Sequence, residues 1–246
     1  MKILTFKISG AFAAFRDPSV TSNQTSYFIP SKSALIGLLG AMMGIERSSN
    51  LGEIYGKQYL DFFSKTSIGI SFDTKNPKKV IYFTNHRSLK EAKTKPYKAE
   101  LVENPRYAVY VDTDESNLKK LYESIVKNEF VYSPYLGHAY CPAAISDGRI
   151  LDTKIVESEG EKTKSVILDE SETYDPTFEV KLEHLSENST VIVERHLHHF
   201  FKDGNLERRV LKHWIPTNGS EFEIKSYSGA NLAKFIKIDD YVVCLY

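Results

Sequence analysis

In the first 133 residues, apolar side chains recur at two different spacings, one typical of strands and the other typical of helices. Residues 2–9 place apolar side chains at alternating positions, which predicts a strand with one buried face. Residues 27–45 lead from a polar start into a continuous apolar stretch, and residues 115–128 repeat apolar side chains at helical spacing, so each segment predicts a helix. Runs of β-branched and aromatic residues predict the remaining strands, at residues 66–73, 79–84, 99–112 and 130–132.

The order of these elements predicts the fold class. The strands at 66–73 and 79–84 flank Asn76-Pro77 and are predicted to pair as a hairpin. The order is strand, helix, two strands, a basic excursion, strand, helix and strand. We interpret it as the β-α-β-β-α-β order of a ferredoxin-like (RRM-like) fold with an insertion after the third strand. This predicts an α+β protein whose first domain spans residues 1–133, with the insertion near residues 85–105.

The second part of the chain, residues 134–246, consists of short β-rich runs separated by polar turns. Its predicted strands lie at residues 164–168, 178–182, 191–194, 222–227 and 241–245. We predict a small antiparallel β unit that packs on the first domain.

Composition excludes several classes of protein. The 246 residues are 41% hydrophobic and 26% charged, which is typical of a soluble globular chain. The longest apolar run, residues 34–45, is too short to cross a bilayer, so we expect a cytoplasmic protein with no membrane partner. Cys141 and Cys244 lie far apart with no CxxC spacing, which predicts two buried thiols rather than a disulfide or a zinc site. The chain has no P-loop or Rossmann fingerprint, and we expect no cofactor.

Charge is balanced over the whole chain but is separated along it. Residues 75–98 contain eight lysines and arginines against one glutamate, a local charge of +7. Residues 151–187 contain eleven acidic residues against four lysines, a local charge of −7. The basic run suits a polyanion such as a nucleic acid, whereas the acidic run would repel one. The alternative interpretation is that both runs are simply solvated loops.

An anion site is predicted at the start of the first helix. Ser31 or Ser33 can cap backbone N–H groups there, and Lys32 adds positive charge to the positive end of the helix dipole. Glycines at 37, 40 and 44 recur at intervals of three and four, which places them near one face and lets another backbone approach. The apolar residues of this segment fit equally well as an ordinary core helix.

A second candidate site is the turn at residues 132–142, where two prolines, a glycine and three tyrosines occur together. Gly137 would let a backbone approach a ligand closely. Tyr135, His138 or Tyr140 would stack on bases or donate hydrogen bonds to phosphate. Turns of this composition also occur as plain connectors between domains.

Two motifs resemble a known protein family. Phe-Ile-Pro-Ser-Lys-Ser-Ala-Leu-Ile-Gly-Leu-Leu-Gly at residues 28–40 and Pro-Tyr-Leu-Gly with Cys-Pro-Ala at residues 134–143 are similar to those of the CRISPR-associated Cas-five family, in the RAMP superfamily. The resemblance covers the chain from end to end in length and in the order of its elements. The variant it most resembles occurs in type I-B surveillance complexes.

This resemblance implies a non-catalytic subunit of a Cascade complex that binds the 5′ handle of CRISPR RNA, caps the assembly and serves antiviral defence. Its implied partners are CRISPR RNA, the backbone and large subunits of the complex and, indirectly, target DNA. It also implies that the basic excursion is a β-hairpin thumb whose cations contact phosphates. The RNA-binding residues predicted on these grounds are Arg16, Ser31, Lys32, Ser33, Arg87, Lys90, Lys93, Lys95, Lys98, Tyr135, Gly137 and His138.

Three alternatives remain open at this point. Some relatives cut precursor CRISPR RNA without a metal, and the side chains for such acid–base chemistry would come from His86, Lys90, Tyr97, His138 and Tyr140. A metal site would draw on the alternating side chains of Glu194, His196 and His198, with His199 beside them. A protein-only structural adaptor would use an apolar surface formed by Phe12, Phe15, Phe62 and Phe63.

Overall fold

The computed structural model describes the 246-residue chain except for residues 22, 49–53, 88–92, 171–178, 203–204 and 229–231. Its helices are α1 (Lys32–Met43), α2 (Lys57–Lys65) and α3 (Glu115–Lys127). Its strands in the first part of the chain are β1 (Lys2–Ser9), β2 (Phe12–Ala13), β3 (Phe15–Arg16), β4 (Ser26–Tyr27), β5 (Ser67–Phe72), β6 (Lys79–Arg87), β7 (Thr94–Glu103) and β8 (Arg106–Asp112). The remaining strands are β9 (Ala144–Asp152), β10 (Ile155–Val156), β11 (Lys162–Thr163), β12 (Ile167–Asp169), β13 (Glu179–His184), β14 (Thr190–Lys202), β15 (Asn205–Thr217), β16 (Phe222–Ser228), β17 (Lys234–Ile238) and β18 (Tyr241–Leu245). The protein is therefore α+β, as the sequence predicts.

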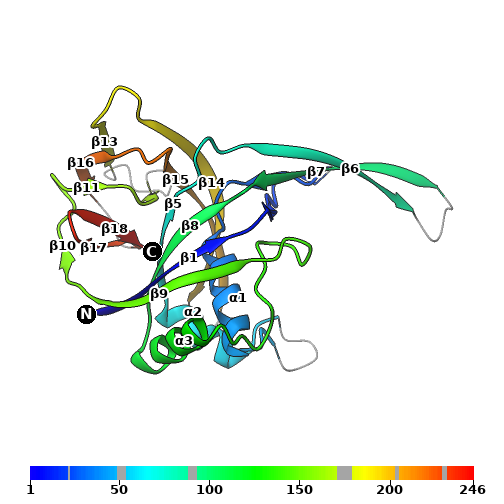
Figure 1. The fold of residues 1–246 in the computed structure, drawn as a ribbon, viewed down its shortest axis with the longest axis horizontal. Coiled ribbons are helices and arrows are strands. Elements are labelled where there is room, and N and C mark those ends of the chain that lie inside the picture. Colours follow the sequence, from blue (N-terminus) through cyan, green and yellow to red (C-terminus); the bar gives the residue numbers. More distant parts are fainter. Residues whose placement is uncertain (22, 49–53, 88–92, 171–178, 203–204, 229–231) are drawn as a thin grey trace.

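The main sheet has the strand order β5-β8-β1-β9, and every neighbouring pair is antiparallel. Apolar residues of β1 alternate into the core, where Leu4, Phe6 and Ile8 join the buried side chains of the helices in one cluster. The helices lie together on one side of this sheet (Figure 1). This cluster fixes α1 against the sheet and against α3.

One strand pairing and one strand predicted from the sequence are wrong. The strand at 66–73 exists as β5, but it pairs with β8, while β6 pairs with β7 along the register from Lys79↔Val102 to Arg87↔Thr94. The single strand predicted at 99–112 is divided by a turn in which Asn104 takes a left-handed φ of 46°. As a result β6 and β7 form a long hairpin that projects from the body of the molecule (Figure 1).

The fourth strand of the main sheet is also not where the sequence predicts it. Residues 130–132 form no strand, and β9 instead takes the edge next to β1, with Ile3 opposite Leu151. Backbone N–H groups of Val131 and Tyr132 donate to carbonyls at the end of α1, so this segment follows the helix rather than the sheet. The sheet is therefore completed by residues beyond position 133.

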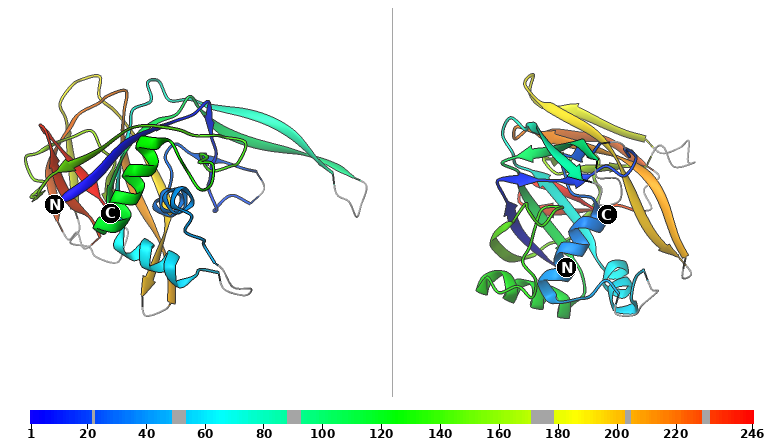
Figure 2. Two further views of the ribbon diagram at one scale, coloured as in Figure 1. Left: turned by 60° about the horizontal axis from the view of Figure 1, so that its bottom comes forward. Right: turned by 90° about the vertical axis from the view of Figure 1, so that its right-hand side faces the viewer.

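The C-terminal part of the chain contributes two further sheets. One has the order β10-β17-β18-β11-β16-β13, and the other has the order β12-β15-β14. The β14–β15 hairpin is far longer than the predicted strand at 191–194, and its outer end reaches beyond the sheets to the side of α1 (Figure 2). Ile68 and Tyr246 exchange two backbone hydrogen bonds of 3.0 Å, which join the end of the chain to the start of β5.

Helix α1 begins at one of the two serines that its sequence predicts as a cap, but it ends before Gly44. Ser31 is the N-cap, and its hydroxyl accepts a hydrogen bond from the Ala34 N–H at 3.3 Å. Gly44 ends the helix in a left-handed conformation with φ 76°. It therefore does not share a helix face with Gly37 and Gly40, although the spacing of the three glycines predicts that it does. Gly37 faces open space, since no atom lies within 4 Å of a Cβ placed there. The predicted close approach of another backbone along this face is therefore wrong at Gly37.

Candidate functional site

A cavity of about 820 Å³ lies along the open side of α1. Its walls come from α1, from the segments on either side of residue 50, from the turn at 132–137 and from β14. Aromatic and small apolar side chains predominate, with a few polar groups among them. The lining residues include Phe15, Ser33, Gly37, Arg47, Tyr55, Tyr132, Tyr135, Gly137 and His199. Concave, mainly apolar cavities with a few polar groups are the usual form of a ligand site.

The turn that forms one wall is fixed by its own backbone. The Leu136 N–H donates to the Cys141 carbonyl at 2.8 Å, and the Ala14 N–H donates to the Leu136 carbonyl at 2.9 Å. Gly137 has φ 86°, and a Cβ there would lie 2.0 Å from the Ala14 oxygen. The glycine is thus required for contact with the protein's own backbone, whereas the sequence suggested contact with a ligand.

The same turn also touches the base of the β6–β7 hairpin. The Tyr82 hydroxyl donates to the Tyr140 hydroxyl at 2.9 Å, and the His138 ring stacks on Tyr140 with centroids 5.0 Å apart. Burial, together with this hydrogen bond, raises the pKa of Tyr140 to about 12. Tyr135 remains 48% exposed. The turn therefore joins the hairpin to the cavity and presents aromatic rings at the junction.

Most of the predicted cations lie along the hairpin. Arg87, Lys93 and Lys95 are exposed there, and Lys98 is half-buried near the hairpin base. Lys98 is opposite Phe83, which is 73% exposed, so a cation and an aromatic ring lie side by side across the strands. Lys90 lies outside the described residues.

Arg16 and the serines lie closer to the cavity. Arg16 is exposed in β3, directly after Phe15, which lines the cavity. Ser33 also lines the cavity, and its hydroxyl is 3.1 Å from that of the capping Ser31. The structure therefore brings Ser33, Tyr135 and Gly137 to one cavity, with His138 and Lys98 at the adjoining hairpin base, whereas the Arg16 side chain does not line the cavity.

Lys32 is half-buried and does not line the cavity. Its Nζ lies 5.6 Å from the centre of the Phe63 ring. Burial lowers the pKa of Lys32 to about 8, with a further contribution from Lys234. Lys32 therefore packs against α2.

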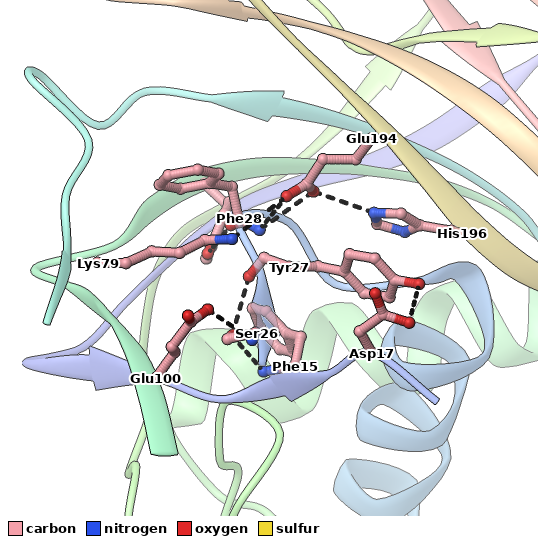
Figure 3. A network of polar contacts seen from close by, with 10 residues as sticks. Phe15, Asp17, Ser26, Tyr27, Phe28, Lys79, Glu100, Glu194 and His196 are labelled. Atoms are coloured by element: carbon pink, nitrogen blue, oxygen red, sulfur yellow. Dashed lines mark hydrogen bonds and ion pairs between the residues drawn. The ribbon is translucent and has the colours of Figure 1, made fainter. Parts of the chain in front are cut away.

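The side chains considered for a metal are used in a structural network, and sequence reasoning missed its extent. Glu194 accepts two hydrogen bonds from the Phe28 N–H, at 2.9 and 3.1 Å, and its Oε2 lies 3.1 Å from His196 Nε2 (Figure 3). The His196 ring stacks on Tyr27 at 4.0 Å, and the Tyr27 hydroxyl donates to Asp17 at 2.9 Å. The network ties β14 to the segment that leads into α1.

Glu194, His196 and His198 do share one face of β14, as their alternation predicts. However, His198 pairs with His213 at 3.1 Å between Nε2 atoms, and burial lowers the pKa of His198 to about 3. Among the described residues, no group of three or more histidine, cysteine or acidic side chains is placed to hold a metal ion. His198 and His213 are instead buried in the core, where burial lowers the pKa of both rings.

The apolar surface considered for a protein adaptor is largely internal. Phe15, Phe62 and Phe63 are buried, with exposed fractions of 6% or less, and only Phe12 of that set is exposed. Cys141 and Cys244 are both buried free thiols, as predicted. In the described part of the chain, no helix has the length and apolar character needed to span a membrane.

Comparison with known proteins identifies the family. The sequence model of the family described as "CRISPR-associated protein (Cas_Cas5)" matches residues 3–222. A solved structure described as "Crystal structure of a CRISPR protein from Archaeoglobus fulgidus" is similar over 99% of this chain and 98% of its own, with a TM-score of 0.54 and 13% identity. Another, described as "CRISPR RNA-guided surveillance complex", is similar over 87% of this chain and 90% of its own, with a TM-score of 0.51 and 14% identity. None of the curated proteins matches the sequence. Because the family model covers most of the chain, the protein belongs to the CRISPR-associated protein (Cas_Cas5) family.

Proposed function

We propose that this protein is a non-catalytic subunit of a type I CRISPR surveillance (Cascade) complex, most like that of type I-B, and that it binds the 5′ handle of CRISPR RNA. Membership of the family supports a role in such a complex. A structural neighbour described as a CRISPR RNA-guided surveillance complex supports the same role. In this proposal the protein caps one end of the assembly, next to backbone and large subunits, and meets target DNA only through the RNA.

The fold is consistent with this role. We interpret β1, α1, β5, β8, α3 and β9 as a ferredoxin-like unit, because its order β5-β8-β1-β9 places the first and third strands in the centre. The β6–β7 hairpin, which leaves the chain between β5 and β8, is then the thumb. The unit and the thumb meet at the turn of residues 134–142.

The single observation that favours RNA binding is the position of that turn. It contacts the cationic hairpin through Tyr82 and Tyr140, and it forms a wall of the aromatic cavity through Tyr135 and Gly137. A single strand can use both surfaces at once, because lysines and arginines contact its phosphates while tyrosines stack on its bases. Lys98 and Phe83 offer both kinds of contact at one pair of positions.

The experiment compares two triple variants in filter binding of single-stranded RNA over a range of salt. Lys93→Ala, Lys95→Ala and Lys98→Ala together should weaken binding and lower the slope of log K against log salt by about 2, from three lost phosphate contacts. The matched control replaces Lys119, Lys120 and Lys127 of α3, which removes the same charge from the far helix. Equal losses in both variants would remove the hairpin from the proposal.

We further propose that the protein does not cleave precursor RNA. The raised pKa of Tyr140 keeps that hydroxyl protonated at neutral pH, so it is not available as a general base, and His138 is stacked against it. Incubation with precursor CRISPR RNA and a chelator should therefore yield no defined product. A defined product that disappears in His138→Ala would show that the enzyme alternative is correct, and absence of any RNA binding would favour the protein-only adaptor.

A further inference from the structure

We propose that Arg47, His199 and Arg208 form a second phosphate-binding site, where β14 and the segment after α1 meet at the cavity. The site would hold the backbone of the same RNA strand after it has passed the turn and the cavity. This inference rests on the proposed function, since it takes the polyanion to be RNA. The sequence pattern points to His199 only as a possible metal ligand, and neither the charge runs nor the motifs point to Arg47 or Arg208.

The β14–β15 hairpin brings two of the three residues together. His199 lies on β14 and lines the cavity. Arg208 is directly opposite it on β15, in the register His199↔Arg208. Directly opposite residues in an antiparallel pair have Cβ atoms about 5 Å apart and point to the same face. Arg208 is therefore a neighbour of the cavity and is exposed.

Arg47 reaches the same place from the other wall. It follows the end of α1, lines the cavity and is exposed. Its guanidinium lies 4.7 Å from the centre of the Tyr55 ring, and its carbonyl accepts a hydrogen bond from the Gly56 N–H at 2.6 Å. Stacking of this kind uses the face of the guanidinium and directs its N–H donors outward in the plane of the group. The side chain is thus held in place with its phosphate-binding edge available to a ligand.

The electrostatics of the three residues favour an anion. Burial lowers the pKa of His199, and the positive charges of Arg208 and Arg47 lower it further, which indicates that both cations act on the same ring. Glu46 also lines the cavity, so two arginines and one glutamate leave a charge of +1 while His199 is neutral. A phosphate at this point would offset the repulsion between the cations and would gain bidentate hydrogen bonds from arginine.

Arg209, on the opposite face of the same hairpin, offers a control substitution for Arg208. Arg209 lies 5.2 Å from the centre of the Phe200 ring and forms a 3.0 Å ion pair with Glu207. Its charge is already paired within the hairpin. Arg208 and Arg209 are therefore adjacent arginines on one strand with different surroundings, and of the two it is Arg208 that lies opposite the cavity residue His199.

The cavity between the turn and this site suits nucleotides. Tyr132 and Tyr135 line it near the turn, and Tyr55 lines it next to Arg47. Aromatic rings placed in this way stack on bases with little dependence on sequence. The site would thus hold the strand with bases in the cavity and phosphates at Arg47 and Arg208.

The test measures binding of a fluorescein-labelled single-stranded RNA of mixed sequence to the full-length protein by anisotropy, over a range of salt. The variant with Arg47→Ala and Arg208→Ala should have a slope of log K against log salt that is shallower by about 1.4, for two lost phosphate contacts on a single strand. Arg209→Ala should keep the wild-type slope. Arg208→Lys should recover most of the slope lost in Arg208→Ala, because it restores the charge.

The outcomes separate this inference from the proposed function. If the double variant keeps the wild-type slope and affinity, the second site does not exist, although RNA binding stands. If the wild-type protein binds no RNA, both proposals fail. Loss of the stack on Tyr55 would lower the melting temperature of the double variant. Arg208→Ala alone avoids that effect and should still reduce the slope by about 0.7.

Discussion

Replacing Gly137 with alanine tests whether the turn is held by its contact with Ala14. A Cβ at this position would lie 2.0 Å from the Ala14 oxygen and 2.6 Å from its carbonyl carbon, where about 3.5 Å is the ordinary separation. The turn or the β2–β3 segment must therefore move by about 1 Å or more. That movement breaks or stretches the hydrogen bond from the Ala14 N–H to the Leu136 carbonyl.

The expected loss of stability follows from these contacts. Left-handed backbone costs alanine about 1 kcal/mol or more relative to glycine, and the positive φ of 86° is set by the turn. Loss of one hydrogen bond adds about 1 kcal/mol. Gly137→Ala should thus lower the free energy of unfolding by about 2–4 kcal/mol, which for a chain of this size lowers the melting temperature by about 5–15 °C.

Gly37→Ala is the matched control, because it makes the same chemical change in the opposite setting. Gly37 lies inside α1, and a Cβ there meets no atom within 4 Å. Alanine is favoured over glycine in a helix by about 1 kcal/mol, so this variant should melt about 2–4 °C higher. Thermal melts followed by circular dichroism measure both. The reasoning fails if Gly137→Ala melts at the wild-type temperature, or if the two variants shift in the same direction.

Three further predictions concern single side chains. Lys32→Met should raise the free energy of unfolding at pH 7 by on the order of 1–3 kcal/mol and leave RNA binding unchanged. The pKa of Lys32 is about 8 in the fold, below its ordinary value of 10.5, so the charged lysine destabilises the fold below pH 8. This destabilisation decreases as the pH rises from 8 to 10.5. Urea titrations at pH 7 and pH 10 measure it, and a difference that does not change with pH would contradict it. Glu194→Ala should lower the free energy of unfolding by about 1–3 kcal/mol, because the part-buried Phe28 N–H loses its acceptor. Glu194→Gln should cost less, because an amide oxygen still accepts. Equal losses in urea titrations of the two variants would show that this bond is not the cause. Tyr82→Phe removes only the hydroxyl contact with Tyr140, so it should lower the free energy of unfolding by less than about 1 kcal/mol. It should nevertheless speed amide hydrogen exchange at the hairpin base. Unchanged exchange would mean that the contact does not restrain the hairpin.

Local signals in the sequence predicted the elements better than their partners. The Ser31 cap and the alternation in β1 act within a few residues, and the structure has both. The pairing of β5 was mispredicted because β5 and β6 are both rich in apolar residues. In the fold, Ile68, Ile70 and Phe72 of β5 are buried, while Phe83 of β6 is 73% exposed. Hydrophobicity along the chain does not distinguish a core strand from an exposed hairpin, because both favour β-branched and aromatic residues.

Some residues of the candidate site could be found from the sequence, and others only from the fold. Composition identified the cationic run at 75–98 and the tyrosine-rich turn, and the order of alternating residues put Glu194 and His196 on one face of a strand. It did not reveal that Arg47 and Arg208 meet beside His199, since these residues come from segments about 150 positions apart.

What the sequence by itself determined is therefore the content of the molecule: its class, its family motifs, the cap and helix at residues 31–44, and the separation of charge along the chain. Only the tertiary structure decided which of those charges are accessible. Lys32 looks like an exposed helix-start cation in the sequence, yet it packs against Phe63, and its pKa falls because burial disfavours the charged form. The physical reason is that the solvation of a side chain depends on residues that reach it from distant parts of the chain.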